Sequence, residues 1–115
     1  MATDVNFEVS DFQTDGVPVL AVQGEIDVAT APQLRERLLA LADRNHAVVV
    51  VDLTGVSFVD STALGVLVSG AKRLRSGGGD LRLVVTEPHI AKVFAITGLT
   101  EVFQIYTTTG EAVSA

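Results

Sequence analysis

The sequence predicts an α/β fold in a single domain, residues 1–115, with a mixed β-sheet and helices packed mainly on one face of that sheet. Three observations support this fold class. Strand-like and helix-like segments alternate along most of the chain. An unbroken apolar run at 47–51 is rich in β-branched residues, which is typical of a strand covered on both faces. Two strand-like segments near the N-terminus are separated by Asp15-Gly16, a pair typical of a hairpin turn.

The first predicted elements are the two strands of this hairpin. Residues 7–15 alternate imperfectly between apolar and polar, which predicts an edge strand, and residues 17–22 predict its partner. Pro18 has no N–H to donate, so we expect the start of the second strand to be unpaired on one side. A helix is then predicted from Thr30, its expected N-cap, to about Asp43.

A second helix is predicted after the valine-rich run. Residues 52–60 are expected to form a connection, and the helix would run from about Ser61 to Arg75. Its buried stripe would consist of apolar residues at helical spacing: Leu64, Leu67, Val68, Ala71 and Leu74. Three consecutive glycines at 77–79 would end this helix.

The C-terminal third predicts a strand, a third helix and a short last strand. The first of these strands is expected at 81–85 and the last at 102–106. Glu87-Pro88 would open the helix, and Gly98 is placed as the glycine that follows its end. The polar tail from about residue 107 is expected to fray.

Composition argues against several classes of function. The chain has no cysteine, which excludes disulfides and thiolate metal sites. Its formal net charge of −6 opposes binding to nucleic acid or to anionic membranes. No apolar run approaches the roughly 20 residues of a membrane helix, and residues 1–5 lack the features of a signal peptide. We therefore expect a cytoplasmic protein without cofactors that binds neither nucleic acid nor membrane.

The two histidines do not indicate a metal site. His46 and His89 are far apart in the sequence and show no metal-binding spacing. The glycine run at 77–79 lacks the Lys-Ser/Thr that would make it a phosphate-binding loop, so a connector is the better interpretation.

Asp60-Ser61-Thr62 is the segment most informative about function, because it places hydroxyl groups where a loop meets a helix. As an N-cap or first-turn residue, Ser61 would have its hydroxyl near the surface. A phosphate there would lie near unpaired N–H groups and the positive end of the helix dipole, so the domain itself could tolerate it. A partner on this surface would instead meet about −1.5 to −2 of added charge beside Asp60. The alternative interpretation is that Ser61 only caps the helix.

The segment from Val51 to Leu67, VDLTGVSFVDSTALGVL, closely resembles STAS domains of the anti-sigma factor antagonist family. Gly24-Glu25-Ile26-Asp27 and the element series up to Phe103 fit as well, so the resemblance covers roughly residues 5–110 and implies a STAS fold. Many members carry glycine where this chain has Ala63. Alanine is the better helix former and leaves the neighbouring hydroxyl in place.

The resemblance also implies a function. In this family the serine after the aspartate is phosphorylated, which corresponds here to Ser61, with Thr62 and Ser57 as secondary candidates. The unphosphorylated protein binds an anti-sigma factor that is also a GHKL-type serine kinase, and the sigma factor is released. Phosphorylation disengages the antagonist, and a metal-dependent serine phosphatase restores it. The chain would thus be a non-enzymatic regulator of transcription in a stress response, and we expect a monomer when it is unbound.

The same resemblance implies a partner-binding surface made of two segments that are distant in the sequence. These are Gly24, Glu25 and Asp27 in one segment and Asp60, Ser61 and Thr62 in the other. A purely structural interpretation of the first segment stays open, in which Gly24 allows a tight turn and Asp27 accepts hydrogen bonds from nearby backbone N–H groups.

Two other functions remain as alternatives. A hydrolase could use Ser61 as nucleophile and His89 or His46 as base, but the Gly-x-Ser-x-Gly elbow is missing. A stand-alone STAS scaffold, or an accessory subunit of a stress-signalling or transport complex, would need no phosphorylation. The sequence does not identify the kinase, the sigma factor or the signal.

Overall fold

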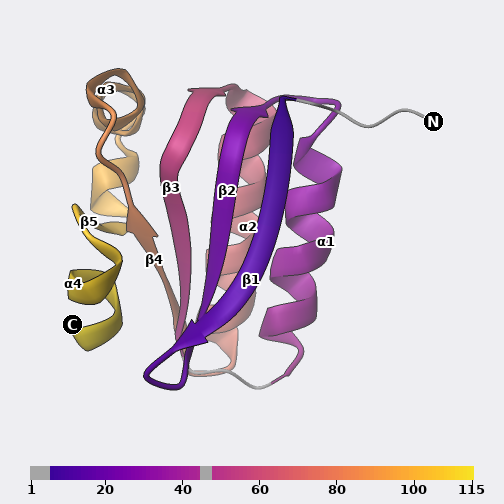
Figure 1. Cartoon of the computed structure of the whole chain (residues 1–115), viewed down its shortest axis with the longest axis vertical. Helices are drawn as coiled ribbons and strands as arrows, with labels where there is room; N and C mark the ends of the chain where they lie inside the picture. The colour runs from indigo at the N-terminus through magenta and orange to yellow at the C-terminus, as the bar shows by residue number, and fades with distance from the viewer. Residues whose placement is uncertain (1–5, 45–47) are drawn as a thin grey trace.

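A computed structural model describes residues 6–44 and 48–115, which form a five-stranded mixed sheet and four α-helices (Figure 1). The predicted fold class is confirmed. The sequence-based expectations for residues 1–5, His46 and Ala47 fall outside these described residues.

The sheet has the strand order β1-β2-β3-β4-β5, with β1 antiparallel to β2 and the other neighbours parallel. The strands are β1 (Phe7–Thr14), β2 (Val17–Ile26), β3 (Val48–Val59), β4 (Asp80–Val84) and β5 (Gln104–Tyr106). Asp15 and Gly16 both have positive φ, 52° and 81°, as the tight hairpin turn between β1 and β2 requires. Pro18 pairs with β1 but precedes the first pair of the β2–β3 ladder, as expected from its missing N–H.

The helices lie mainly on one face of the sheet. They are α1 (Ala31–Ala42), α2 (Ser61–Ser76), α3 (Pro88–Ile96) and α4 (Thr109–Ser114), and a short 3₁₀ turn covers Leu99–Glu101. Figure 1 shows α1 and α2 side by side against the sheet, whereas α4 lies beside β4 and β5. The main core lies between the sheet and α1 and α2.

The valine run of β3 is covered on both faces, as its composition predicted. Val49 and Val51 belong to the main core, whereas Val50 packs on the other face with Val84 and with Ala112 of α4. The expectation that the tail from residue 107 frays is therefore wrong. The tail is ordered because Ala112 is fully buried and closes a second, smaller apolar cluster.

Two strands are longer than the sequence predicted. β2 continues to Ile26, and residues 52–59 are part of β3, not of a connection. Beyond Asp52, β3 has no ladder pair with β4, but its ladder with β2 continues to the Ile26–Val59 pair. Gly24 and Gly55, which lies in the expected connection, are both within paired strands.

The last strand is shorter than predicted, since the 3₁₀ turn precedes it and β5 begins only at Gln104. The buried face of α2 also differs in detail from its predicted stripe. Leu64 and Val68 are only partly buried, whereas Ala63, Val66 and Gly70 are buried with the rest. None of the described helices is long and apolar enough to cross a membrane.

Gly70 of α2 packs directly against Leu38 of α1. A Cβ at this position would lie 2.3 Å from Cδ2 of Leu38, whose side chain is only 1% exposed and has little room to move. A Cβ on Gly65, in the same helix, would meet nothing within 4 Å. The two glycines thus separate a packing requirement from helix propensity.

We expect Gly70→Ala to lower the free energy of unfolding by about 1–3 kcal/mol, because the added methyl group overpacks the interface between α1 and α2. Gly65→Ala should raise it by about 0.5–1 kcal/mol through helix propensity alone. Urea denaturation followed by circular dichroism measures both changes. Equal effects of the two substitutions would contradict this description of the helix interface.

Candidate functional site

Helix α2 begins at Ser61, and its N-cap is Asp60. One Asp60 carboxylate oxygen, Oδ1, accepts a hydrogen bond of 3.0 Å from the Ala63 N–H, and the Asp60 backbone has the extended conformation of a cap. Ser61 is exposed, and its hydroxyl makes no hydrogen bond within the described part of the chain. The interpretation that Ser61 merely caps the helix is therefore wrong, since Asp60 does this.

The long β2–β3 ladder places the two predicted segments next to each other. Ile26 pairs with Val59 at the end of the ladder, and the Asp60 N–H then donates to the Ile26 carbonyl over 3.2 Å. The chain leaving β2 therefore lies beside the first turn of α2. Glu25 and Thr62 are both exposed at this end of the domain.

Asp27 organises the loop between β2 and α1. Its Oδ1 accepts hydrogen bonds from the N–H of Ala29 at 2.9 Å and of Thr30 at 3.1 Å. Of the two interpretations of Asp27, the structure thus shows the loop-holding one directly. Thr30 stands at the N-cap position of α1, but its side chain makes no cap bond, contrary to expectation. Its hydroxyl lies instead within 2.9 Å of both the Asp27 N–H and the Glu25 carbonyl.

Gly24 is required by a close approach of two backbones. Its φ is +96°, and a Cβ there would lie only 1.6 Å from the Asn6 carbonyl oxygen. The same carbonyl accepts the Glu25 N–H at 2.7 Å. Gly24 therefore allows a bend within β2, at a register shift of the β2–β3 ladder, and not a tight turn.

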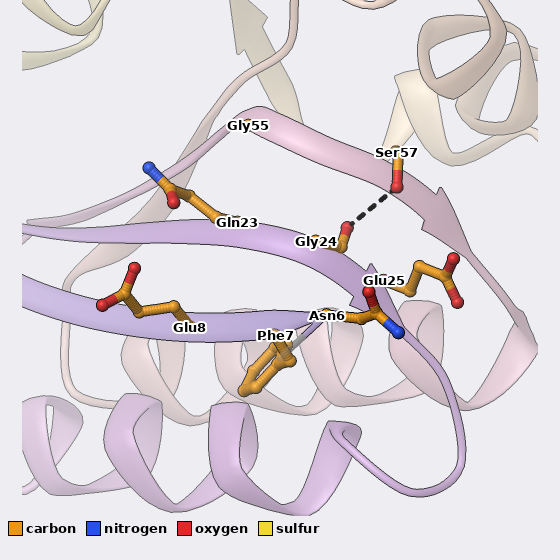
Figure 2. A pocket seen from close by; sticks show the side chains of 8 residues that line it. All are labelled: Asn6, Phe7, Glu8, Gln23, Gly24, Glu25, Gly55 and Ser57. Carbon is orange, nitrogen blue, oxygen red and sulfur yellow. Dashed lines mark hydrogen bonds between the residues drawn. The ribbon is translucent and has the colours of Figure 1, made fainter. Parts of the chain in front are cut away.

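Ser57 is the extra residue at this register shift, since Val56 pairs with Gly24 and Phe58 with Glu25. Its hydroxyl donates to the Gly24 carbonyl at 3.4 Å, as Figure 2 shows. Ser57 also borders a surface hollow of about 320 Å³, which is lined in addition by Asn6, Phe7, Glu8, Gln23, Gly24, Glu25 and Gly55. The hollow is thus polar and lies over the bend of β2.

His89, in the first turn of α3 as predicted, contacts the part of β3 that extends beyond its ladder with β4. Its Nε2 lies 2.7 Å from the Ser57 carbonyl oxygen, and its Nδ1 lies 3.0 Å from Glu87 Oε1. Both ring nitrogens thus face acceptors, and only the protonated ring can donate to both. The Ser57 carbonyl, followed by the Glu87 carboxylate, raises the pKa of His89 above its ordinary value of 6.5.

The charge around Ser61 is negative. Glu25, Asp27 and Asp60 take part in none of the four ion pairs found among the described residues. Those pairs join Asp11 to Arg37, Asp43 to Arg73, Asp80 to Arg75 and Glu87 to His89. The arrangement favours a partner that brings its own basic groups.

Two exposed apolar side chains flank these carboxylates, and sequence reasoning missed both. Val28, in the β2–α1 loop, is 71% exposed, and Phe58, near the end of β3, is 48% exposed. Apolar residues in a predicted strand or loop are ordinarily assigned to the core, so the sequence carried no signal of their exposure.

Serine hydrolysis and metal binding each require a particular arrangement of side chains. No hydrogen bond joins Ser61 to a histidine within residues 6–44 and 48–115. Over the same residues, no group of three His, Cys, Asp or Glu side chains is arranged to hold a metal ion.

We expect the imidazole of His89 to titrate above pH 6.5 in an NMR titration, with the resonance assigned from a His89→Gln variant. A raised folded-state pKa means that protonated His89 contributes stability that is fully present below pH 6.5 and is lost as the pH rises through that pKa. Glu87→Gln should lower the midpoint. A midpoint at or below 6.5 in the unsubstituted chain would contradict the double acceptor geometry.

Comparisons with known proteins agree with this architecture. The family model of the STAS domain matches residues 9–112. The anti-sigma-B factor antagonist of Listeria monocytogenes is 36% identical over 108 residues, covering 94% of each chain. That of Bacillus subtilis is 38% identical over 101 residues, covering 88% of this chain and 92% of its own.

A solved structure agrees over nearly the whole length. The crystal structure of an anti-sigma factor antagonist from Mycobacterium paratuberculosis superposes with a TM-score of 0.88 at 29% identity, covering 99% of this chain and 97% of its own. The resemblance noted in the sequence is thereby confirmed, and the chain belongs to the STAS domain family.

Proposed function

We propose that this chain is an anti-sigma factor antagonist whose binding is switched by phosphorylation of Ser61. The unphosphorylated form binds an anti-sigma factor that is also a GHKL-type serine kinase, and this releases the sigma factor. The kinase then phosphorylates Ser61 and the antagonist dissociates, until a metal-dependent serine phosphatase removes the phosphate. The relatives named as anti-sigma-B factor antagonists support the regulatory role.

The observation that carries the proposal is the division of roles at the start of α2. Asp60 supplies the cap, and Ser61 keeps an exposed hydroxyl without a described partner. A kinase could therefore phosphorylate this hydroxyl without breaking a hydrogen bond of the folded domain. Thr62 and Ser57 remain secondary candidates, but the Ser57 hydroxyl already donates to Gly24.

Phosphorylation would act mainly on the partner and not on the domain. A phosphate on Ser61 would lie at the N-terminus of a 16-residue helix, where unpaired N–H groups and the helix dipole stabilise an anion. It would also add about −1.5 to −2 of charge beside Asp60, on a surface that already carries Glu25 and Asp27. A partner that packs closely against this surface would have to desolvate that charge.

We propose that the partner-binding surface comprises Gly24, Glu25, Asp27, Asp60, Ser61 and Thr62, extended by the exposed side chains of Val28 and Phe58. The carboxylates would orient basic groups of the partner, while Val28 and Phe58 would supply the apolar contacts that interfaces need at their centre. The chain itself would have no catalytic activity and would act in the cytoplasm.

The Ser61 switch is tested by incubating the purified chain with ATP and each GHKL-type kinase of the same genome, then measuring intact mass. One added phosphate is expected, located at Ser61 by tandem mass spectrometry and absent from Ser61→Ala, while Thr62→Ala still accepts it. Calorimetry should show the phosphorylated chain binding the kinase roughly 100-fold more weakly, equivalent to about 3 kcal/mol of like-charge and desolvation cost. Equal affinities of the unphosphorylated, phosphorylated and Ser61→Ala chains would contradict the switch. No phosphate with any active kinase would instead favour a non-phosphorylated STAS scaffold or an accessory subunit of a transport complex.

The apolar part of the surface has a matched control within the chain. Phe58 in β3 and Phe12 in β1 are both strand residues and both 48% exposed, but only Phe58 lies near Ser61. Phe58→Ser should weaken kinase binding about tenfold or more, and Phe12→Ser should leave it unchanged. Circular dichroism of both variants would show that the fold is kept. Equal losses in the two variants would move the docking surface away from Ser61.

A further inference from the structure

Among the described residues no strand pairs with the outer edge of β1, and this edge is long for one without a strand partner. β1 has eight residues, and its register with β2 shows which of their backbone groups point away from the sheet. The Glu25 N–H donates to the Asn6 carbonyl. The even-numbered residues of β1 therefore direct their backbone N–H and C=O groups toward β2. Phe7, Val9, Asp11 and Gln13 therefore direct their N–H and C=O groups outward, and such a row can template pairing with another strand.

Arg37 of α1 reaches over the middle of this edge. Its Nη1 donates to the outward-facing Val9 carbonyl at 3.2 Å, and its Nη2 donates to Asp11 Oδ1 at 2.6 Å. The side chain is 39% exposed, and a hollow of about 220 Å³ lined by Val9, Gln33, Glu36 and Arg37 lies beside it. A strand added to β1 would need the Val9 carbonyl that Arg37 occupies.

We propose that Arg37 holds the β1 edge closed, and that this edge is a self-association surface on which a second copy of the chain would add its own β1. This inference does not rest on the function proposed for Ser61. The Arg37 guanidinium competes for an acceptor that the incoming backbone would need, so the guarded chain stays monomeric.

The strand sequence favours a second copy as the occupant. In an antiparallel pair related by a two-fold axis at Ser10, every outward-facing residue meets an outward-facing residue: Phe7 meets Gln13, and Val9 meets Asp11. The residues whose backbone groups point toward β2 also pair with one another: Glu8 lies opposite Phe12, and Ser10 lies opposite its own copy. No like charges lie directly opposite each other, and the half-exposed Phe12 gains a neighbour. If the two-fold axis instead lay at Asp11, one residue toward the C-terminus, the two Asp11 side chains would lie directly opposite each other.

The test compares Arg37→Met, which keeps the aliphatic stem and loses the donors, with Arg35→Met on the same helix. Arg35 is exposed and forms no ion pair within the described residues. Sedimentation equilibrium should show the unsubstituted chain and Arg35→Met as monomers of about 12.1 kDa. Arg37→Met should dimerise with a Kd on the order of 100 μM, as expected of a small interface.

A second substitution tests the register. Ser10 is exposed and faces its own copy across the proposed axis, so Arg37→Met with Ser10→Lys should be monomeric again, while Arg37→Met with Ser10→Ala should remain dimeric. Hydrogen exchange at the Val9 and Asp11 amides should slow only in the dimeric variants. A monomeric Arg37→Met chain, a dimer that Ser10→Lys does not dissociate, or edge amides protected only by the kinase partner would each overturn the proposal.

Discussion

The parallel ladder between β2 and β3 is the constraint on which the rest of the structure depends. It continues after β4 has ended and places Ile26 beside Val59. One further hydrogen bond, from the Asp60 N–H to the Ile26 carbonyl, then fixes the start of α2 against the β2–α1 loop. Gly24 makes the bend in β2 possible, and His89 occupies the Ser57 carbonyl where β3 has lost its other neighbour. Strand pairing thus brings the two segments of the site together.

The groups that stabilise the fold at this site differ from the groups that are proposed to bind the partner. Asp27 and Asp60 use a carboxylate oxygen to satisfy backbone N–H groups, while the Ser61 hydroxyl and the side chains of Val28 and Phe58 stay at the surface. Residues that contribute little to the fold can change charge without unfolding it. We therefore expect a modification at Ser61 to alter binding while the domain keeps its structure.

Local sequence patterns predicted much of the fold. The hairpin followed from Asp15-Gly16, and the two-sided cover of β3 followed from its valine run, because turn chemistry and burial act over a few residues. The full lengths of β2 and β3 could not be predicted in this way. Gly24, for example, is needed because the Asn6 backbone lies against it, and this contact joins residues far apart in the sequence. Helix α4 was missed because a six-residue polar segment with one fully buried side chain, Ala112, has no periodicity to detect.

For the site, the sequence placed Ser61 and Asp60 correctly at the start of a helix, but the assignment of Thr30 as a capping side chain was wrong because its hydroxyl is used inside the loop. The function implied by the STAS resemblance concerns which partner binds at this site. Local sequence patterns do not contain that information. We propose that phosphorylation of Ser61 would change the surface of the domain and not its fold. Amide ¹H–¹⁵N spectra of the chain with and without phosphoserine at position 61 test it most directly. Shift changes confined to the β2–α1 loop, the end of β3 and the first turn of α2 are expected, whereas changes that extend to β4 or α4 would contradict the account.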